Sequence, residues 1–452
     1  MAFGSFEDFK KSQLGSFAKY VDAKDSEFKD YLNKEFQEYK EFQGIPLYKK
    51  EKPKNIITKT PKKIQSLGPK VNISVDVPKE KKSSLDILQH QNKDLVFNFF
   101  GSNIGFNYDK NIKNAKFYPQ NQKGIQNFFE ILASSDYGDL IGDIKKVQRD
   151  LNLNDWGVYL LVHKISSSIF TNKDDQEIFN WFVFNKLGYD VRIGLASKHI
   201  IVMYYSKKVI YATPNYILNK KKFYVISHYT KDNIGNVYSY AQNYPGATKP
   251  LDLALKTLPA FRQDMRQKVL KFQEFGVTYK INLKYNQNMI DFMATYPQAD
   301  YETYFNAPLD DITYISVITQ LRKYINGQRA SRAINFVLHF VQKSFKYEVD
   351  QEQFKREKVM FAYETLYYTH SDCEDRAVLF AYLMREMFHI SVVGVKYDDH
   401  MATALYIPIK GDSVFLHHKR FVIADPTYIN ANIGESMQKY RTKIPTDFIR
   451  LY

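Results

Sequence analysis

The sequence contains one cysteine, Cys373, among its 452 residues. A single cysteine excludes an intramolecular disulfide, so cysteine usage gives no evidence about the compartment. No run of 18 apolar residues occurs, which excludes a membrane-spanning helix at this stage. The chain also lacks a phosphate-binding loop, a GxGxxG pattern and any residue set with metal-site spacing, so we expect no nucleotide cofactor and no metal.

Aromatic residues are abundant, at 16% of the chain, within a hydrophobic total of 44%. This composition can fill substantial cores, and the length predicts two to four domains. The formal net charge of +15 is concentrated between Lys49 and Lys82, where eleven lysines and three acids give a surplus of eight. Four prolines in the same stretch predict an extended basic linker. The arginine and aromatic residues of a nucleic-acid platform are missing there, so we expect no nucleic-acid partner, with weak contact to an acidic polymer as the alternative.

The residues around Cys373 predict a helix that begins at the cysteine. Ser371 and Asp372 can cap this helix, and Glu374 and Asp375 suit the positive end of its dipole. An apolar stripe then follows at helical spacing: Val378, Leu379, Tyr382, Leu383 and Met387. A thiol at a helix N-terminus faces free N–H groups, which favour the thiolate and can stabilise an oxyanion.

Three strand-like runs follow this helix, at Ile390–Val395, Met401–Ile407 and Arg420–Ala424. His400 stands at the start of the second run, and Asp425 comes directly after the third. Neighbouring antiparallel strands lie about 5 Å apart, so the histidine and the aspartate can meet if these strands pair.

In these residues the chain resembles the transglutaminase-like superfamily of papain-like cysteine enzymes. The likeness rests on the sequence from Asp372 to Asp375 with Ala377 and Leu379, then on His400, and then on Asp425-Pro426-Thr427, and it covers about the last third of the chain. The resemblance implies that Cys373 is the nucleophile, His400 the general base and Asp425 the residue that orients the histidine. Ser371 departs from the glycine usual in the family, but serine suits a helix cap.

Taken singly, each of these residues has an ordinary structural reading. A lone cysteine is often a small buried hydrophobe, and a histidine after two aspartates or an Asp-Pro pair is typical of turns. In this order and together, they favour a catalytic triad. The resemblance then implies a bacterial cysteine hydrolase, a protease or amidase acting on a protein or peptide substrate through a thioester. The alternative is a non-catalytic binding or scaffold protein.

A second stretch repeats the pattern of the first. Asp174–Gly194 lies over Glu374–Gly394 at a constant offset of 200, and His163 falls on His339 in the preceding helix at an offset of 176. We therefore predict two copies of one unit, with chance similarity between short helix-strand segments as the alternative.

The first copy differs from the second at the positions of the predicted triad. Lys173 stands in the place of Cys373, His199 falls within one residue of His400, and His228 stands near the place of Asp425. Without a nucleophile this copy cannot form an acyl intermediate, so we expect a degenerate domain.

The expected fold is α+β, with a papain-like or transglutaminase-like core of helices packed on an antiparallel sheet. The predicted segments are an amphipathic helical segment at 1–47, the basic linker at 48–90, the degenerate domain at 91–236, a β-rich connecting domain at 237–309 and the domain with the triad at 310–452. No signal peptide is visible after Met1, which leaves a cytoplasmic protein or an exported one without its leader. The opening segment resembles the start of mature exported bacterial proteins and favours the periplasm.

Overall fold

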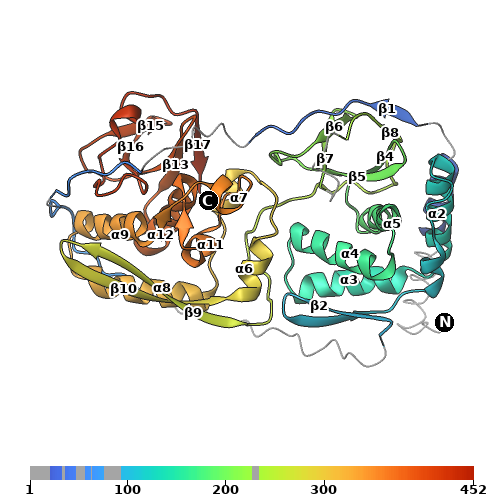
Figure 1. The fold of residues 1–452 in the computed structure, drawn as a ribbon, viewed down its shortest axis with the longest axis horizontal. Helices are drawn as coiled ribbons and strands as arrows, with labels where there is room; N and C mark the ends of the chain where they lie inside the picture. Colours follow the sequence, from blue (N-terminus) through green and yellow to red (C-terminus); the bar gives the residue numbers. More distant parts are fainter. Residues whose placement is uncertain are drawn as a thin grey trace, which may run out of the picture. The chain divides into compact units, whose positions relative to one another are not determined.

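The computed structural model describes residues 21–32, 36–46, 56–62, 64–75, 93–226 and 234–451. These residues fall into two compact units (Figure 1). Unit 1 comprises Met1–Ile45, Leu85–Phe99 and Asn103–Asp252, and unit 2 comprises Pro46–Ser84, Phe100–Ser102 and Leu253–Tyr452. Both contain helices and an antiparallel sheet, which confirms the α+β class. Within the described ranges, no helix is both long and apolar enough to cross a membrane.

Unit 1 combines helices with a six-stranded antiparallel sheet. Its helices are α2 (Gln122–Ser134), α3 (Gly138–Asp150), α4 (Asp155–Ile169) and α5 (Lys173–Lys186), preceded by a helix over 21–31 and the 3-10 helix η2 (Lys110–Asn114). Its strands, in sheet order, are β1 (Gln37–Tyr39), β8 (Val237–Ser239), β4 (Val191–Ala196), β5 (His199–Tyr205), β7 (Lys221–Val225) and β6 (Asn215–Leu218). Strands β2 (Leu95–Phe99) and β3 (Ser102–Phe106) form a separate hairpin.

Unit 2 has the larger set of elements. Its helices are α6 (Gln287–Met293), α7 (Tyr301–Phe305), α8 (Asp311–Ile325), α9 (Ala330–Ser344), α10 (Asp350–Gln353), α11 (Ala362–Tyr367), α12 (Cys373–Phe388) and the 3-10 helix η3 (Gln438–Tyr440). Its five-stranded sheet runs β15 (Ser413–Leu416), β16 (Lys419–Ala424), β14 (Met401–Leu405), β13 (Val392–Lys396), β17 (Asp447–Arg450). A long hairpin, β9 (Met265–Glu274) with β10 (Val277–Asn286), packs against α8 and α9, and the short strands β11 (Lys346–Tyr347) and β12 (His370–Ser371) pair in parallel.

Helix α12 lies at the centre of unit 2 (Figure 1). It contacts β13 and β14 of the sheet as well as α9 and α11, and it is buried on all sides for most of its length. A helix in this position needs apolar residues around its whole circumference, which explains its Leu-, Phe- and Met-rich sequence. The strand next to it carries Gly394, where an added Cβ would come within 2.9 Å of Phe305. The sequence therefore uses glycine where sheet and helix approach closely.

The two sheets have the same strand order relative to the helix that precedes them. After α5 the order is β8-β4-β5-β7-β6, and after α12 it is β17-β13-β14-β16-β15. Asp175 and Asp375, each the third residue of its helix, also play the same role. Asp175 accepts a hydrogen bond from the backbone N–H of Phe117 at 2.7 Å, and Asp375 accepts one from Met360 at 2.8 Å.

The N-terminal segment is only partly helical. The helix over 21–31 places Phe28 against the rings of Phe129, Trp181 and Tyr244, as expected for a stripe that docks on the rest of the protein. The helical prediction is wrong further on, because Gln37–Tyr39 forms strand β1, which pairs with β8 at the edge of the sheet. Edge pairing satisfies backbone groups whatever the local helix propensity. The earlier aromatic residues of the stripe lie outside the described residues.

The basic linker is extended, as predicted, but the part that the structure describes is not free in solvent. The backbone N–H of Lys59 donates to the carbonyl of Ile429, and the N–H of Ile429 donates to the carbonyl of Ile57, which forms a parallel bridge at Thr58. Lys70 forms an antiparallel bridge with Arg329. We call residues 56–62 and 64–75 the strap. The strap is hydrogen-bonded along unit 2, because the prolines and lysines that rule out a packed core do not prevent backbone pairing.

The segment predicted as a β-rich connecting domain is divided between the units. Val237–Asp252 belongs to unit 1 and supplies β8, whereas the residues from Leu253 belong to unit 2. The predicted strand pair is present as β9 and β10, and it packs on α8 and α9. The apolar side chains on one face of the hairpin are buried only when they pack on these two helices, which explains why the hairpin belongs to unit 2 rather than to a domain of its own.

Candidate functional site

The start of α12 is fixed by the residues around it. The backbone N–H of Asp372, the N-cap, donates to the carboxylate of Asp375 at 3.1 Å. Just before it, Ser371 pairs with Tyr347 in the short parallel β11–β12 ladder. Caps of this kind are the sequence signal from which the helix start was predicted. Cys373 is consequently the first residue of α12, as predicted.

A buried arginine anchors this helix start to the end of α9. The guanidinium of Arg376 donates to the Ser371 hydroxyl at 3.0 Å and to the carbonyls of Gln342 and Phe345 at 3.2 and 2.8 Å. Burial lowers the pKa of Arg376 to about 10. These three hydrogen bonds from one planar guanidinium fix the position of the chain just before Cys373.

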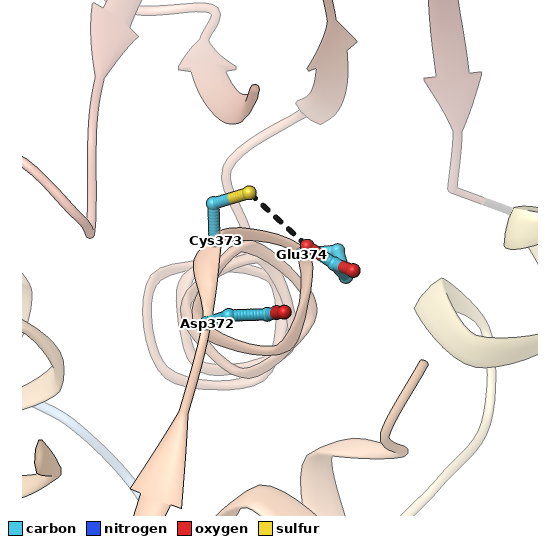
Figure 2. Close-up of side chains that lie close together, drawn as sticks. All are labelled: Asp372, Cys373 and Glu374. Atoms are coloured by element: carbon cyan, nitrogen blue, oxygen red, sulfur yellow. Dashed lines mark hydrogen bonds between the residues drawn. The ribbon is translucent and has the colours of Figure 1, made fainter. Parts of the chain in front are cut away.

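The thiol of Cys373 has a partner on its own helix. Figure 2 shows the sulfur turned toward Glu374, and the thiol donates to the Glu374 Oε2 atom at 3.1 Å. The side chain is only 2% exposed. In this arrangement the thiol proton is directed to a carboxylate, so nucleophilic attack requires the sulfur to turn away from Glu374 by rotation about the Cα–Cβ bond.

His400 and Asp425 meet across paired strands. His400 precedes β14 and Asp425 follows β16, and β14 and β16 pair directly. The Nε2 atom of the histidine lies 2.9 Å from Oδ2 of the aspartate. The other carboxylate oxygen accepts from the N–H groups of Thr427 and Tyr428 at 2.9 and 3.2 Å. With both of its oxygens engaged, Asp425 is well placed to fix the orientation of the imidazole.

Tyr440 covers the histidine of this pair. Its ring stacks on His400 at a centroid distance of 4.7 Å and an interplanar angle of 20°. Burial is the main reason why the pKa of Tyr440 is raised far above its usual value, and the charges of Asp399, Cys373 and Asp425 add to the rise. The tyrosine is itself only 8% exposed and covers one face of the histidine.

The structure joins two members of the predicted triad, His400 and Asp425, by a hydrogen bond, and the third, Cys373, begins helix α12, which packs on β14. His400 Nε2 is bonded to Asp425, so Nδ1 is the ring nitrogen left to face a thiol. The sequence analysis missed three contributors to the site: Tyr440, Arg376 and the Glu374 carboxylate as acceptor for the thiol. Tyr440 carries no sequence signal, because it comes from η3, beyond the last predicted strand.

Several carboxylates around the start of α12 lie close together. Single oxygens of Asp350, Asp372 and Asp375 fall within 4.8 Å of one another, as do ligand atoms of Asp372, Cys373 and Glu374 and those of Asp350, Glu357 and Glu374. Hard oxygen ligands of this kind suit calcium or magnesium. The grouping brings together three segments of the chain, so it has no recognisable spacing in the sequence. Acidic clusters are also common without an ion.

The corresponding place in unit 1 has different chemistry. Lys173 is the first residue of α5, and its ammonium donates to Gln176 at 3.2 Å. His199 is exposed and lies 3.4 Å from Asp174. His228 lies outside the described residues. A lysine at this position supplies no sulfur nucleophile.

Comparisons with known proteins give no match: no protein-family model, no curated protein and no solved structure is similar to this chain.

Proposed function

We propose that the protein is a transglutaminase-like cysteine hydrolase that cleaves a peptide or isopeptide amide through a thioester intermediate. The proposal is supported above all by the 2.9 Å contact between His400 and Asp425, formed by two neighbouring strands. Helix α12 packs on β14, one of these two strands, and begins with Cys373. A nucleophile, a base and a residue that orients the base therefore come from adjoining elements of one unit.

The reaction would proceed in two stages. His400 accepts the thiol proton at Nδ1, and the sulfur of Cys373 attacks the amide carbon while the backbone N–H of Cys373 stabilises the oxyanion. The imidazolium then gives its proton to the leaving amine, and a thioester forms. In the second stage His400 takes a proton from water, whose oxygen attacks the thioester carbon. The acid product leaves and the proton returns to the sulfur. Asp425 stabilises the imidazolium throughout.

A second candidate function is a non-catalytic binding or scaffold protein. One observation favours it: the thiol donates to Glu374, and Cys373 and His400 are only 2% and 5% exposed. In a scaffold protein these residues would serve only to pack the interior.

Thiol alkylation distinguishes the two candidates. The native protein is treated with iodoacetamide between pH 5 and pH 9, and labelling of its one cysteine is followed by mass spectrometry. The enzyme requires labelling well below the pH of about 8.5 at which a free thiol ionises. It also requires His400→Ala to abolish that low-pH labelling, while His199→Ala, an exposed histidine of unit 1, leaves it unchanged. A thiol that reacts only after denaturation would instead establish the scaffold.

We also infer that units 1 and 2 are two copies of one papain-like module. The identical strand order after α5 and α12 supports this, together with the equivalent roles of Asp175 and Asp375. In this interpretation only the second copy has kept the nucleophile. Expressing the protein with Lys173→Cys tests the degenerate site: the added thiol should remain unreactive below pH 8, because His199 is exposed and lies beside Asp174 rather than in a buried pair.

A further inference from the structure

Unit 2 contains an open cavity of about 350 Å³ that the proposed chemistry does not use. Its wall is formed by the strap, by the turn between β9 and β10, by α9 and by the segment after β16. Cavities of this volume are at the lower end of the range for small-molecule sites. The polar side chains in its wall are Lys62, Gln273, Glu274, His339, Lys343 and Asn430.

Among the described residues of the wall, Glu274 is the one acidic group, and both of its oxygens are engaged. Oε1 lies 2.8 Å from Nδ1 of His339, and Oε2 accepts from the ammonium of Lys343 at 2.5 Å. Burial alone would raise the pKa of Glu274, but the hydrogen bonds and charges of His339 and Lys343 outweigh it and lower that pKa. Glu274 is therefore an ionised carboxylate that has its cations within the protein and does not need one from a ligand.

His339 lies between two hydrogen-bond acceptors. While Nδ1 faces the Glu274 carboxylate, Nε2 lies 3.2 Å from the carbonyl oxygen of Ala431. The ring is only 3% exposed, so these two contacts fix its orientation beside Glu274.

The wall therefore holds more positive than negative charge. Lys62 and Lys343 are opposed by Glu274 alone among the described lining residues, which leaves one positive charge in excess. The ammonium of Lys343 has three protons, and the contact with Glu274 uses one of them. Lys62 belongs to the strap and is exposed. Its ammonium can reach an occupant without loss of buried contacts.

We propose that this cavity is a binding site for a small molecule with an oxyanion group, a carboxylate or a phosphate. The two lysines hold the oxyanion by charge-assisted hydrogen bonds, and the Glu274–His339 pair keeps Lys343 in position. The side chains of Gln273 and Asn430 line the remainder of the cavity. The volume is far larger than the roughly 30 Å³ that one water occupies, so it accommodates a small organic anion rather than a bare ion. This site is independent of the proposed hydrolase activity.

Calorimetric titration of the full-length protein tests the proposal. Citrate and inorganic phosphate serve as separate probes, each compared with sodium chloride at matched ionic strength. Saturable binding of citrate alone identifies a carboxylate ligand, and binding of phosphate alone identifies a phosphate. If neither citrate nor phosphate shows saturable binding above that seen with sodium chloride, the proposal is wrong.

Three variants locate the binding. Lys62→Gln changes an exposed side chain and should weaken binding about tenfold, because it removes one charge-assisted hydrogen bond. Lys343→Gln should weaken it at least as much. Lys271→Gln changes an exposed lysine of β9 outside the cavity and should leave the affinity unchanged. Equal weakening by all three variants would indicate a general charge effect and refute the site. Unchanged affinity in both Lys62→Gln and Lys343→Gln would also refute it. Binding that persists in Cys373→Ala separates this site from the proposed catalytic site.

Discussion

Replacement of Glu374 by glutamine should make Cys373 more reactive. In the native structure the thiol donates to the Glu374 carboxylate at 3.1 Å, and both side chains are almost completely buried. A negative carboxylate next to the sulfur opposes formation of the thiolate, which is the nucleophilic form. The variant Glu374→Gln keeps the size of the side chain and removes this charge, so a larger fraction of the sulfur should be ionised at a given pH.

The size of the effect follows from the distance. Two unit charges 3.1 Å apart repel by about 1.3 kcal/mol in a medium with the dielectric constant of water, and by about 5 kcal/mol at an effective value of 20. Rotation of the sulfur away from Glu374 reduces the repulsion, so the smaller figure is the safer guide. Since about 1.4 kcal/mol corresponds to a factor of ten, the thiolate fraction near pH 7 should rise about tenfold or more.

The rate of alkylation measures this fraction. Labelling by iodoacetamide at pH 7 is followed in the range where the rate is proportional to reagent concentration, so that chemistry rather than opening of the site is limiting. Glu386→Gln is the matched control, because Glu386 lies at the other end of α12 beside Arg385. Thermal unfolding shows whether each variant is folded. A rate for Glu374→Gln within twofold of the native rate, in a folded protein, would refute the assigned contact.

Three further predictions concern other buried groups. Tyr440→Ala removes the ring that covers His400, so labelling of Cys373 should become several-fold faster. The free energy of unfolding in urea should fall by about 3 kcal/mol, because a buried aromatic side chain is lost. Burial raises the pKa of Glu177 to about 8, so the folded state holds a proton that the unfolded state has released above its pKa of 4.5. The unfolding free energy of unit 1 should then fall by roughly 4 kcal/mol as pH rises from 4.5 to 8, and urea titrations of Glu177→Gln should lack this fall. In the native protein the ammonium of Lys358 lies 2.6 Å from the carboxylate of Glu364, and both side chains are buried. Glu364→Gln should lower the free energy of unfolding in urea by about 3–5 kcal/mol, because it leaves Lys358 buried without an anionic partner. Adding Lys358→Met to this variant should restore much of that free energy.

The elements that could be predicted from the sequence are those whose signals are local. The start of α12 at Cys373 follows from capping residues and an apolar stripe, and β14 and β16 follow from short apolar runs. The meeting of His400 with Asp425 needed one more assumption, that these strands pair, and they do. Of the predicted triad, this contact is the part that geometry now supports directly.

Other features depend on contacts between distant segments and have no local signal. Tyr440 reaches His400 from a 3-10 turn near the end of the chain, and Arg376 joins α12 to carbonyls of α9. The paired strap was missed for a different reason. A stretch rich in lysine and proline has too few apolar side chains to build a core, but its backbone N–H and C=O groups remain able to pair with a neighbouring segment.

The strap also determines where the chain can be divided into fragments that keep unit 2 intact. Ile57 and Lys59 hydrogen-bond to Ile429 on both sides of Thr58, only four residues beyond Asp425. A fragment that starts at Leu253 would contain every strand of the unit 2 sheet and all three residues of the predicted triad. It would lack the strap, whose backbone hydrogen bonds to Ile429 would be lost to water. Adding residues 56–75 back as a synthetic peptide would be the natural way to restore them. Unit 2 is therefore built from stretches of the chain that unit 1 separates in the sequence, and backbone hydrogen bonds hold the strap to the later stretch.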